Sequence, residues 1–350
     1  MDNKNLFING SSLSGGLGVI DIKSPWDRQV FATVASASRE QALMAVISSD
    51  GAFQNWRFSN ISDRIEILSK AVKSLRQDTD RLSHLLHREI GKFDNDAKSE
   101  ISRSIDYIEL TISAIKHWKG SLYYGDIDPK FPRNRKTGMY SRVPLGVVLA
   151  ISPFNYPINL SVTKVIPALL SGNTVVLKPP TQGSYTSYEF YQHFLDAGLP
   201  AGVLNIVTGS SSEIGDTLLT HEKVKLIAFT GSTEVGNHIK TVSNGVPLLM
   251  ELGGKDIGIV TENADIDRTV DEIVKGAYSY CGQRCTAQKL VLAHRDIADS
   301  FSKRLTEVAG SVEVNPMIED KAVDYVMELY NDAVTKGAQV QIAPNHNGNH

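Results

Sequence analysis

The segment GVVLAISPFNYPINLSVTKVIPALLSGNTVVLKPP, residues 146–180, determines the fold class of this chain. Two apolar runs, 146–151 and 173–177, flank a stretch with helical spacing of apolar residues at 158–170. Neither run alternates polar with apolar residues, which is typical of a strand buried on both faces of a sheet. A buried strand, a helix and a second buried strand predict a βαβ unit with parallel strands.

The same alternation continues to residue 242. A helix is predicted at 184–197, and strands at 204–207 and 226–229 are followed by helices at about 212–219 and 233–242. Four strands alternating with four helices predict an α/β fold built on a doubly wound parallel sheet. Ligands bind such sheets outside the carboxyl ends of the strands. Four dipeptides begin the loops expected there: Ser152-Pro153, Lys178-Pro179, Thr208-Gly209 and Thr230-Gly231.

The residues before this sheet have two patterns. Short strands at 6–8, 19–22 and 30–34, with a turn at Asn9-Gly10, come first. Three amphipathic helices follow. We expect them at 39–56 with Ser38 as the cap, at 62–90 with Gly91 as the stop, and at 94–118.

A second αβ pattern follows residue 255. Strands are predicted at 256–260, 290–293 and 338–342, and helices at 266–280, 297–308 and 321–335. Residues 120–144, which contain tyrosine, glycine, proline and many basic residues, are expected to form an exposed hairpin.

The composition limits the classes of function. The chain has 350 residues, 41% hydrophobic and 21% charged, with a net charge of −3, an ordinary globular balance with room for two domains. This charge gives no reason to expect nucleic acid or an anionic membrane as a partner. No apolar run reaches about 18 residues and the start lacks the apolar centre of a secretion signal, so neither a membrane span nor a leader is predicted. The two cysteines, Cys281 and Cys285, exclude a disulfide scaffold and fit a reducing cytoplasm.

The sequence Gln283-Arg284-Cys285-Thr286 is the first candidate for chemistry. A free cysteine is usually buried and inert. These flanks are polar for a core, however, and the positive charge of Arg284 would favour the thiolate form of the neighbouring thiol. A metal site is the other alternative, because Cys281 and Cys285 would share one face of a helix. Structural zinc needs four ligands, and no further cysteine or histidine pair follows at ligand spacing.

Four motifs together carry a family resemblance. They are GQRCT at 282–286, MELGGK at 250–255, PFNYP at 153–157 and FTGS at 229–232. They resemble the cysteine, glutamate, asparagine and nicotinamide-turn motifs of the NAD(P)-dependent aldehyde dehydrogenases, in that family's order and at its spacings. The resemblance runs over nearly all of the chain and implies an aldehyde dehydrogenase-like fold. It implies a cofactor domain of residues 1–119 and 145–250, an oligomerisation hairpin at 120–144 and a catalytic domain from 251 to 350.

The resemblance also implies a mechanism. Cys285 would attack the aldehyde carbonyl, and the side-chain amide of Asn155 with the backbone N–H of Cys285 would donate to the oxyanion. After hydride transfer, Glu251 would activate water to hydrolyse the thioester. Each assignment has an ordinary alternative, since Asn155 could be a turn residue and Glu251 a solvated charge at a strand end. The apolar neighbours of Glu251 predict partial burial of its carboxylate.

The cofactor loop predicts NADP. NAD-preferring relatives commonly carry glutamate where Thr181 stands, and a carboxylate there would repel a 2′-phosphate. Thr181 is neutral and Lys178 supplies positive charge, although an incidental threonine in a proline-rich turn is the alternative. The resemblance gives these positions to the cofactor: Ser152, Pro153, Lys178, Pro180, Thr181, Asp216, Phe229, Thr230, Gly231, Ser232, Leu252 and Gly253.

The substrate expectation depends on arginines. The strings at 145–157 and 179–183 match the non-phosphorylating glyceraldehyde-3-phosphate branch of the family, in which arginines gather the substrate phosphate. The substrate residues implied are Arg103, Asn155, Tyr156, Arg284 and Thr286. Arg103 could equally be a solvated helix charge, and another aldehyde could be the substrate.

The resemblance also sets expectations about length. Family members continue for about a further hundred residues, the size of a further half-domain, including a strand that completes the oligomer sheet. The catalytic domain is therefore expected to be truncated here, and the strand that makes relatives into homo-oligomers is expected to be absent. Two hypotheses follow: a working NADP-dependent dehydrogenase of glyceraldehyde 3-phosphate, or an inactive fragment that only binds cofactor.

Overall fold

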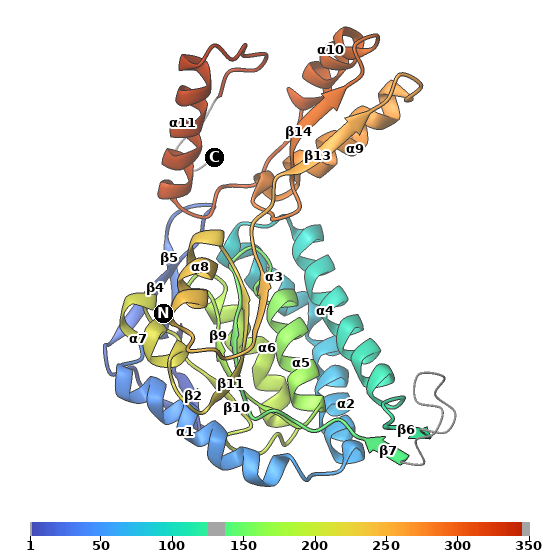
Figure 1. Cartoon of the computed structure of the whole chain (residues 1–350). Helices are drawn as coiled ribbons and strands as arrows, with labels where there is room; N and C mark the ends of the chain where they lie inside the picture. Colours follow the sequence, from blue (N-terminus) through green and yellow to red (C-terminus); the bar gives the residue numbers. More distant parts are fainter. Residues whose placement is uncertain (1, 125–136, 345–350) are drawn as a thin grey trace.

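A seven-stranded sheet forms the centre of the larger part of the molecule (Figure 1), in a computed structural model that describes residues 2–124 and 137–344. Its order is β12-β11-β8-β9-β10-β2-β3. The first five strands run parallel. They are β12 (Leu248–Glu251), β11 (Val224–Thr230), β8 (Val147–Ile151), β9 (Thr174–Lys178) and β10 (Leu204–Ile206). The predicted doubly wound sheet is confirmed, and β12 is an additional strand that the sequence patterns did not predict.

Helices cover both faces of this sheet. One face packs against α1 (Arg39–Trp56), α7 (Ser211–Leu219) and α8 (Thr233–Val242). The other packs against α5 (Asn159–Leu170) and α6 (Ser184–Asp196), which are backed by α2 (Ile61–Gln77), α3 (Thr79–Ile90) and α4 (Asp94–Ile115). Along β8, Val147 and Leu149 enter the first core, whereas Val148 and Ala150 enter the second. Burial on both faces explains the uninterrupted apolar run in the sequence.

The N-terminal residues extend the sheet and form a second one. Strands β2 (Leu6–Ile8) and β3 (Ser11–Leu13) form a hairpin at the β10 edge. Its turn residues Asn9 and Gly10 both have positive φ, 53° and 75°, as the predicted turn requires. Strands β1 (Asp2–Lys4), β4 (Val19–Lys23) and β5 (Val30–Ala35) form a separate three-stranded sheet.

Three expectations about the secondary structure are wrong. The helix predicted at 62–90 is divided into α2 and α3 at Asp78, whose carboxylate accepts hydrogen bonds from Arg81 and His193. The helix predicted to reach residue 280 ends at Tyr278. Residues 338–342 are an exposed loop without a strand partner in the described part of the chain, and an isolated strand is not stable in water. The caps at Ser38 and Gly91 are confirmed.

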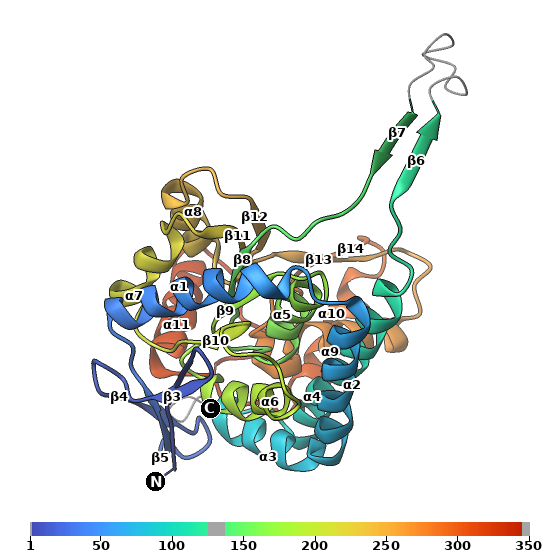
Figure 2. The same ribbon diagram turned by 90° about the horizontal axis from the view of Figure 1, so that it is seen from below.

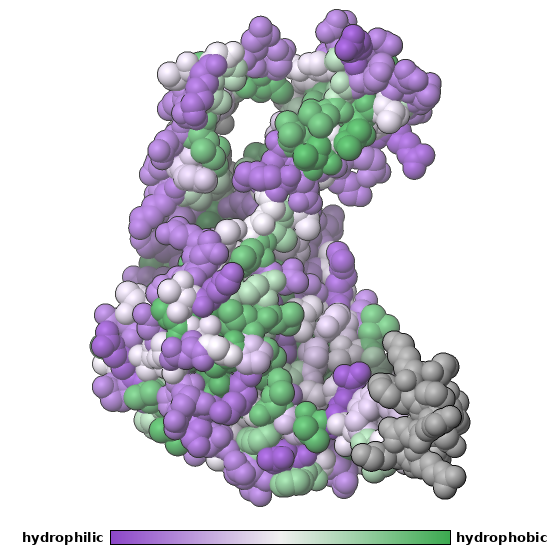
Figure 3. Space-filling view, in the orientation of Figure 1, coloured by the Kyte–Doolittle hydropathy of each residue, from purple (hydrophilic) through white to green (hydrophobic). Residues whose placement is uncertain are grey.

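A smaller part of the molecule holds the residues after 255. Parallel strands β13 (Asp256–Val260) and β14 (Gln288–Ala293) pack on α9 (Ile266–Tyr278) and α10 (Ala298–Ala309) with a core of their own. The opposite face of this sheet is open, and Figure 3 shows hydrophobic residues gathered there. The exposed side chains are Ile257, Ile259, Leu290 and Leu292. Helix α11 (Asp320–Thr335) lies apart from this sheet (Figure 1), and its first residue Asp320 pairs with Arg28.

The expected hairpin has two paired strands. Strand β6 (Ser121–Tyr124) pairs antiparallel with β7 (Thr137–Tyr140), and Figure 2 shows the pair extending away from the body. Residues 125–136, in the middle of the predicted hairpin, lie outside the described residues. Of the helices that the structure describes, none has the length and apolar character needed to cross a membrane.

Candidate active site

The carboxyl ends of the parallel strands bring four of the expected site residues to one edge. Thr230 ends β11 beside Glu251 at the end of β12, and Ile151 of β8 lies opposite Lys178 of β9. Ser152 directly follows β8. The chain builds the sheet outward from β8 to β10 and then returns to place β11 on the other side of β8. Such a reversal opens a crevice between the two loops that follow the central strands.

Two buried glutamates close helix N-termini along this edge. Glu89 Oε1 accepts from the backbone N–H groups of Gly183 and Tyr185 at 2.8 and 2.9 Å, at the start of α6. Glu100 Oε1 accepts from Ile158 and Asn159, each at 3.1 Å, at the start of α5. Burial raises the pKa of Glu89. An anionic cofactor group therefore cannot use these two helix ends.

Helix α8 offers an open N-terminus instead. Its N-cap Ser232 is exposed, and the Ser232 hydroxyl accepts from the backbone N–H of Val235. The helix follows Gly231 at the carboxyl end of β11. Backbone N–H groups and the helix dipole make such an end suitable for a phosphate. The FTGS motif at 229–232 therefore lies where an anionic ligand can bind.

The asparagine loop and the cysteine loop are in direct contact. Asn155 Nδ2 donates to the backbone carbonyl of Gln283 at 2.8 Å. Asn155 Oδ1 and Ser152 Oγ are buried without a hydrogen-bond partner; with Gln288 Oε1 they are the unsatisfied buried side-chain atoms among the described residues. Buried polar groups are normally paired, so two orphans in one short loop point to a place that a ligand would complete. These atoms fit the polar groups of a nicotinamide cofactor or substrate.

The cysteine loop begins with a left-handed turn. After α9 ends, Tyr280, Cys281 and Gly282 all have positive φ, at 53°, 52° and 67°. Left-handed backbone costs a residue other than glycine about 1–2 kcal/mol. The buried Tyr280 holds the turn, because its hydroxyl donates to the carbonyl of Ile90 at 2.6 Å. This anchored turn explains why the predicted helix stops early, and Gly282 adopts the left-handed backbone that glycine accommodates without strain.

The two cysteines differ in access. Cys285 is exposed, whereas Cys281 is half-buried, and burial raises the pKa of the Cys281 thiol. They lie on a turn rather than on one face of a helix. The alternative of a buried, inert cysteine therefore does not apply to Cys285, which is the thiol that a substrate can reach.

The glutamate motif lies against the cysteine loop. A Cβ atom added at Gly254 would lie 2.6 Å from the carbonyl oxygen of Cys285. Glu251 itself is exposed, so the expected partial burial of its carboxylate is wrong. The reason is that β12 is the edge strand of the sheet, with no strand beyond it among residues 2–124 and 137–344. The exposed carboxylate can meet water from solvent.

A buried lysine lies near the same glutamate. Lys164 Nζ donates to Thr230 Oγ1 at 2.6 Å and to the carbonyl of Leu160 at 2.9 Å. Burial lowers the pKa of Lys164 to about 8, and the negative charge of Glu251 partly opposes this shift. The hydrogen bond from Lys164 therefore holds the Thr230 side chain in place.

Two of the expected substrate residues, Arg103 and Arg284, act electrostatically on a third, Tyr156. Burial raises the pKa of Tyr156, while the positive charges of Arg284 and Arg103 act in the opposite direction. Arg103 is exposed on α4. Arg284 is half-buried and donates to the carbonyls of Ser279 and Gly276 at 3.2 and 2.6 Å. Thr286 is exposed beside Cys285. The positive charges of the two guanidinium groups act on Tyr156 together with the negative charges of Glu100 and Asp96, which oppose them.

The remaining expected cofactor residues lie on α7 and in the loops after the parallel strands. Burial lowers the pKa of Lys178 to about 8. Thr181 is exposed, and Pro153 and Pro180 are half-buried. Asp216 on α7 is exposed, and its Oδ1 lies 2.7 Å from His238 Nε2 on α8. Leu252 packs so closely on Gly236 that a Cβ there would lie 2.5 Å from Leu252 Cδ2. Phe229 is buried, Gly231 is half-buried and Gly253 is exposed.

Sequence reasoning missed the pair Lys92 and Glu100. Their charged groups lie 2.5 Å apart, and the two side chains are 1% and 0% exposed. Lys92 also contacts the ring of Tyr156. The available signal was the spacing of Glu100, which shares the apolar face of α4 with Ala97, Ile101 and Ile108. A charge at a core-facing position requires a partner.

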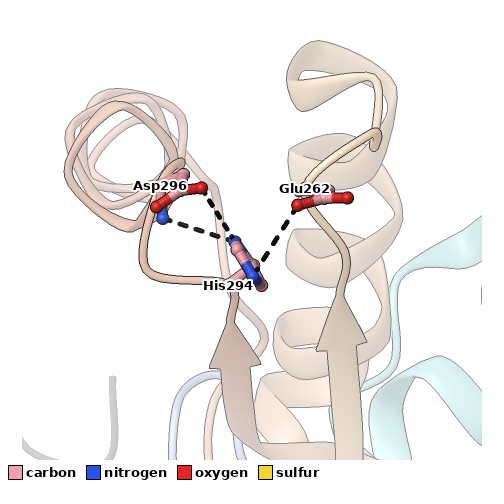
Figure 4. Close-up of side chains that lie close together, drawn as sticks. All are labelled: Glu262, His294 and Asp296. Carbon is pink, nitrogen blue, oxygen red and sulfur yellow. Dashed lines mark hydrogen bonds and ion pairs between the residues drawn. The ribbon is translucent and has the colours of Figure 1, made fainter.

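One group of side chains in the described residues could hold a metal ion. Glu262, His294 and Asp296 converge after the carboxyl ends of β13 and β14 (Figure 4), with His294 nitrogens 3.8 Å from each carboxylate. All three residues are exposed. Neighbouring exposed acids and histidines are common without a metal, and this group is separate from the cysteine loop.

Comparison with known proteins identifies the class. The sequence model of the Aldehyde dehydrogenase family matches residues 14–349. The parallel sheet, the exposed Cys285 and the loops around it are thus those of a known family. This chain belongs to the aldehyde dehydrogenase family.

Several similar relatives are named NADP-dependent glyceraldehyde-3-phosphate dehydrogenase. The protein of Streptococcus equinus is 40% identical over 340 residues, which cover 94% of this chain and 71% of that protein. The protein of Pisum sativum is 37% identical over 334 residues, covering 91% and 66%. The solved structure from Bacillus halodurans, complexed with NADP, superposes with a TM-score of 0.95 at 34% identity, covering 100% of this chain and 75% of that one. The chain thus spans 66–71% of the length of these two curated relatives.

Proposed function

We propose that this chain carries the machinery for NADP-dependent oxidation of glyceraldehyde 3-phosphate to 3-phosphoglycerate, without inorganic phosphate. The observation that carries the proposal is the convergence of three loops. Asn155 donates to the carbonyl of Gln283, and Gly254 lies against the carbonyl of Cys285. A nucleophile, an amide donor and a carboxylate are the groups that thioester chemistry needs.

The residues divide the chemistry between them. The Cys285 thiolate attacks the aldehyde carbon, and the Asn155 amide with the Cys285 backbone N–H stabilises the oxyanion. Bound NADP supplies the hydride acceptor. The thioester on Cys285 then reacts with water, and Glu251, exposed to solvent, removes a proton from that water. Hydrolysis releases the acid and returns the thiol to Cys285.

The choice of NADP is supported by the loop after β9. Thr181 is exposed and neutral, so no carboxylate stands where it would repel a 2′-phosphate. The pKa of Lys178 is lowered by burial alone, with no charged neighbour contributing, and an incoming phosphate would stabilise the protonated form. Ser152 Oγ, buried without a partner, is a further group that the cofactor would satisfy. The names of these relatives also include NADP.

The phosphorylated substrate is supported by charge. Arg103 and Arg284 both act on Tyr156, next to Asn155. One guanidinium group can donate two parallel hydrogen bonds to two oxygens of a phosphate. A second candidate is an unphosphorylated aldehyde, because a relative from Picrophilus torridus, 34% identical over 346 residues, is named D-glyceraldehyde dehydrogenase (NADP(+)). The two substrates differ by the phosphate that these arginines would bind.

The organisation of the chain is part of the proposal. The separate hydrophobic core of β13, β14, α9 and α10 supports a cofactor domain of residues 1–119 and 145–250 and a catalytic domain from 251 to 350. The exposed strands β6 and β7 support an oligomerisation role for the hairpin at 120–144. Two free cysteines support a cytoplasmic location.

The test is NADPH formation by the purified 350-residue protein with NADP and glyceraldehyde 3-phosphate in phosphate-free buffer. The control is Cys285→Ser, with Cys281→Ser as the matched second variant. Turnover that is lost only in Cys285→Ser would support the activity and the nucleophile. Folded protein that binds NADP without turnover would favour the hypothesis of a fragment that binds only the cofactor.

A further inference from the structure

A buried ion pair lies directly behind the two reactive loops. Lys92 follows the last turn of α3, Glu100 lies on α4, and their charged groups are 2.5 Å apart. A buried pair is costly unless the remaining hydrogen-bonding capacity of both groups is used. The second oxygen of Glu100 is used, since it accepts from the backbone N–H groups of Ile158 and Asn159. Glu100 therefore fixes the chain three residues after Asn155.

The lysine side of the pair touches both loops. Lys92 Nζ lies 3.4 Å from the ring centroid of Tyr156 and 5.1 Å from that of Tyr280. Tyr156 follows the amide donor, and Tyr280 begins the turn that leads to Cys285. A cation held over two aromatic faces attracts both of them. One ammonium group thus joins the asparagine loop to the cysteine loop.

We propose that Lys92, held by Glu100, is a positioning residue that sets the separation of the Asn155 amide from the Cys285 thiol; this inference rests on the proposed function. Lys92 does not touch the reacting atoms. It acts through Tyr156 and Tyr280, whose loops are already joined by the hydrogen bond from Asn155 to Gln283. Oxyanion stabilisation depends steeply on geometry, and a displacement of about 1 Å can cost a hundredfold in rate.

A purely structural role for the pair makes a different prediction. Lys92→Met would then lower stability and lower activity only in proportion to unfolded protein. Arg64→Met is the matched control, because Arg64 is also a buried cation and donates to the carbonyls of Trp56 and Leu170, at the ends of α1 and α5. Both variants lose a buried positive charge, but only Lys92 contacts the reactive loops.

The experiment measures kcat, KM and the free energy of unfolding for wild type, Lys92→Met, Lys92→Arg and Arg64→Met. We expect kcat of Lys92→Met to fall about ten- to hundredfold with KM changed by less than about threefold. Lys92→Arg should recover most of kcat, and Arg64→Met should keep kcat within about twofold while losing stability. Equal kcat losses in Lys92→Met and Arg64→Met, or an unchanged kcat in Lys92→Met, would overturn the proposal.

A second readout does not depend on the substrate. In a Cys281→Ser background, the rate of Cys285 alkylation by iodoacetamide reports the surroundings of the thiol. We expect Lys92→Met to change this rate by at least about threefold and Arg64→Met to leave it unchanged. An unchanged rate in Lys92→Met overturns the positioning role, even if wild type oxidises no aldehyde. Should Lys92→Met fail to fold, Glu100→Gln, which keeps an acceptor for Ile158 and Asn159, replaces it with the same expectations.

Discussion

The side-chain amide of Asn155 donates to the backbone carbonyl of Gln283 across 2.8 Å. The bond joins the loop after β8 to the loop that carries Cys285, although the two residues are 128 positions apart in the chain. The same amide is the proposed donor to the oxyanion, so the bond holds it within reach of the place where the substrate carbonyl would bind. Its partner oxygen, Asn155 Oδ1, is buried and unpaired.

The first prediction concerns this amide. Asn155→Ala removes the donor and should lower kcat by about a hundred- to a thousandfold, the cost of removing one oxyanion donor. Initial rates of NADPH formation measure it. Asn159→Ala is the control, because Asn159 Nδ2 donates to Ser104 rather than to the cysteine loop. A decrease in kcat of less than about tenfold in Asn155→Ala would contradict the assignment of Asn155 as an oxyanion donor.

The second prediction concerns the 2′-phosphate. Thr181→Glu places a carboxylate on an exposed position, so the fold should be unaffected. Like charges brought together cost several kcal/mol, so kcat/KM for NADP should fall about a hundredfold or more while that for NAD rises or is maintained. Steady-state rates with each cofactor measure the ratio. Thr181→Ser keeps the hydroxyl and should keep the preference, and an unchanged ratio in Thr181→Glu would contradict the assignment.

Much of the fold could be predicted because its signals are local. The run at 147–151 is apolar throughout because its alternate side chains enter two different cores. The strand β12 was missed, since it is short and at the edge, and half of its side chains are exposed. The break at Asp78 was missed, and one hydrogen-bond partner of its carboxylate, His193, lies 115 positions later in the chain.

The candidate site divides in the same way. Motifs identified Cys285, Asn155 and Glu251 as individual residues, and the order of the parallel strands brings the loops of Asn155 and Glu251 to one edge of the sheet. Local sequence could not indicate that Glu251 is exposed, because the exposure depends on which strand lies at the edge of the sheet. Nor could it indicate that Lys92 contacts Tyr156 and Tyr280, since those contacts exist only after three segments have packed together.

The third prediction is a pH dependence from Lys178. Its pKa in the folded protein is about 8, below its ordinary 10.5, because of burial. A 2′-phosphate prefers the protonated lysine, so KM for NADP should rise as pH increases through about 8, by up to about tenfold per pH unit. In wild type, the dependence of KM on pH should be weaker for NAD than for NADP. In Lys178→Met, KM for NADP should not depend on pH in this range. A KM for NADP that does not change with pH in wild type would contradict binding of the 2′-phosphate by Lys178.

Over the same pH range, the affinity for NADP should fall whereas the stability of the folded protein should rise. Between pH 8 and 10.5 the unfolded chain still holds a proton that folded Lys178 has lost. The free energy of unfolding therefore gains a positive slope with pH from this group. Urea denaturation of wild type and Lys178→Met across this range measures the difference, and the contribution is present only in wild type. Parallel slopes in the two proteins would show that Lys178 does not titrate as expected.

The fourth prediction concerns substrate charge. Arg103 is exposed on α4, and its charge acts on Tyr156 beside Asn155. Hydrogen bonds to charged groups contribute about 1.5–3 kcal/mol, so Arg103→Ala should lower kcat/KM for glyceraldehyde 3-phosphate by about ten- to a hundredfold. The same variant should leave kcat/KM for unphosphorylated glyceraldehyde within about twofold, because that substrate has no phosphate for the guanidinium to bind.

The control for Arg103 is Arg304→Ala, which removes an exposed arginine that donates to Asp267 and Glu307 in the smaller part of the molecule. It should leave both substrates unaffected. Equal losses for the two substrates in Arg103→Ala would indicate a general effect on the site and would favour the unphosphorylated aldehyde as the substrate. A selective loss would instead tie the discrimination to one guanidinium group, with Arg284, partly engaged by the carbonyls of Ser279 and Gly276, supplying the remaining positive charge.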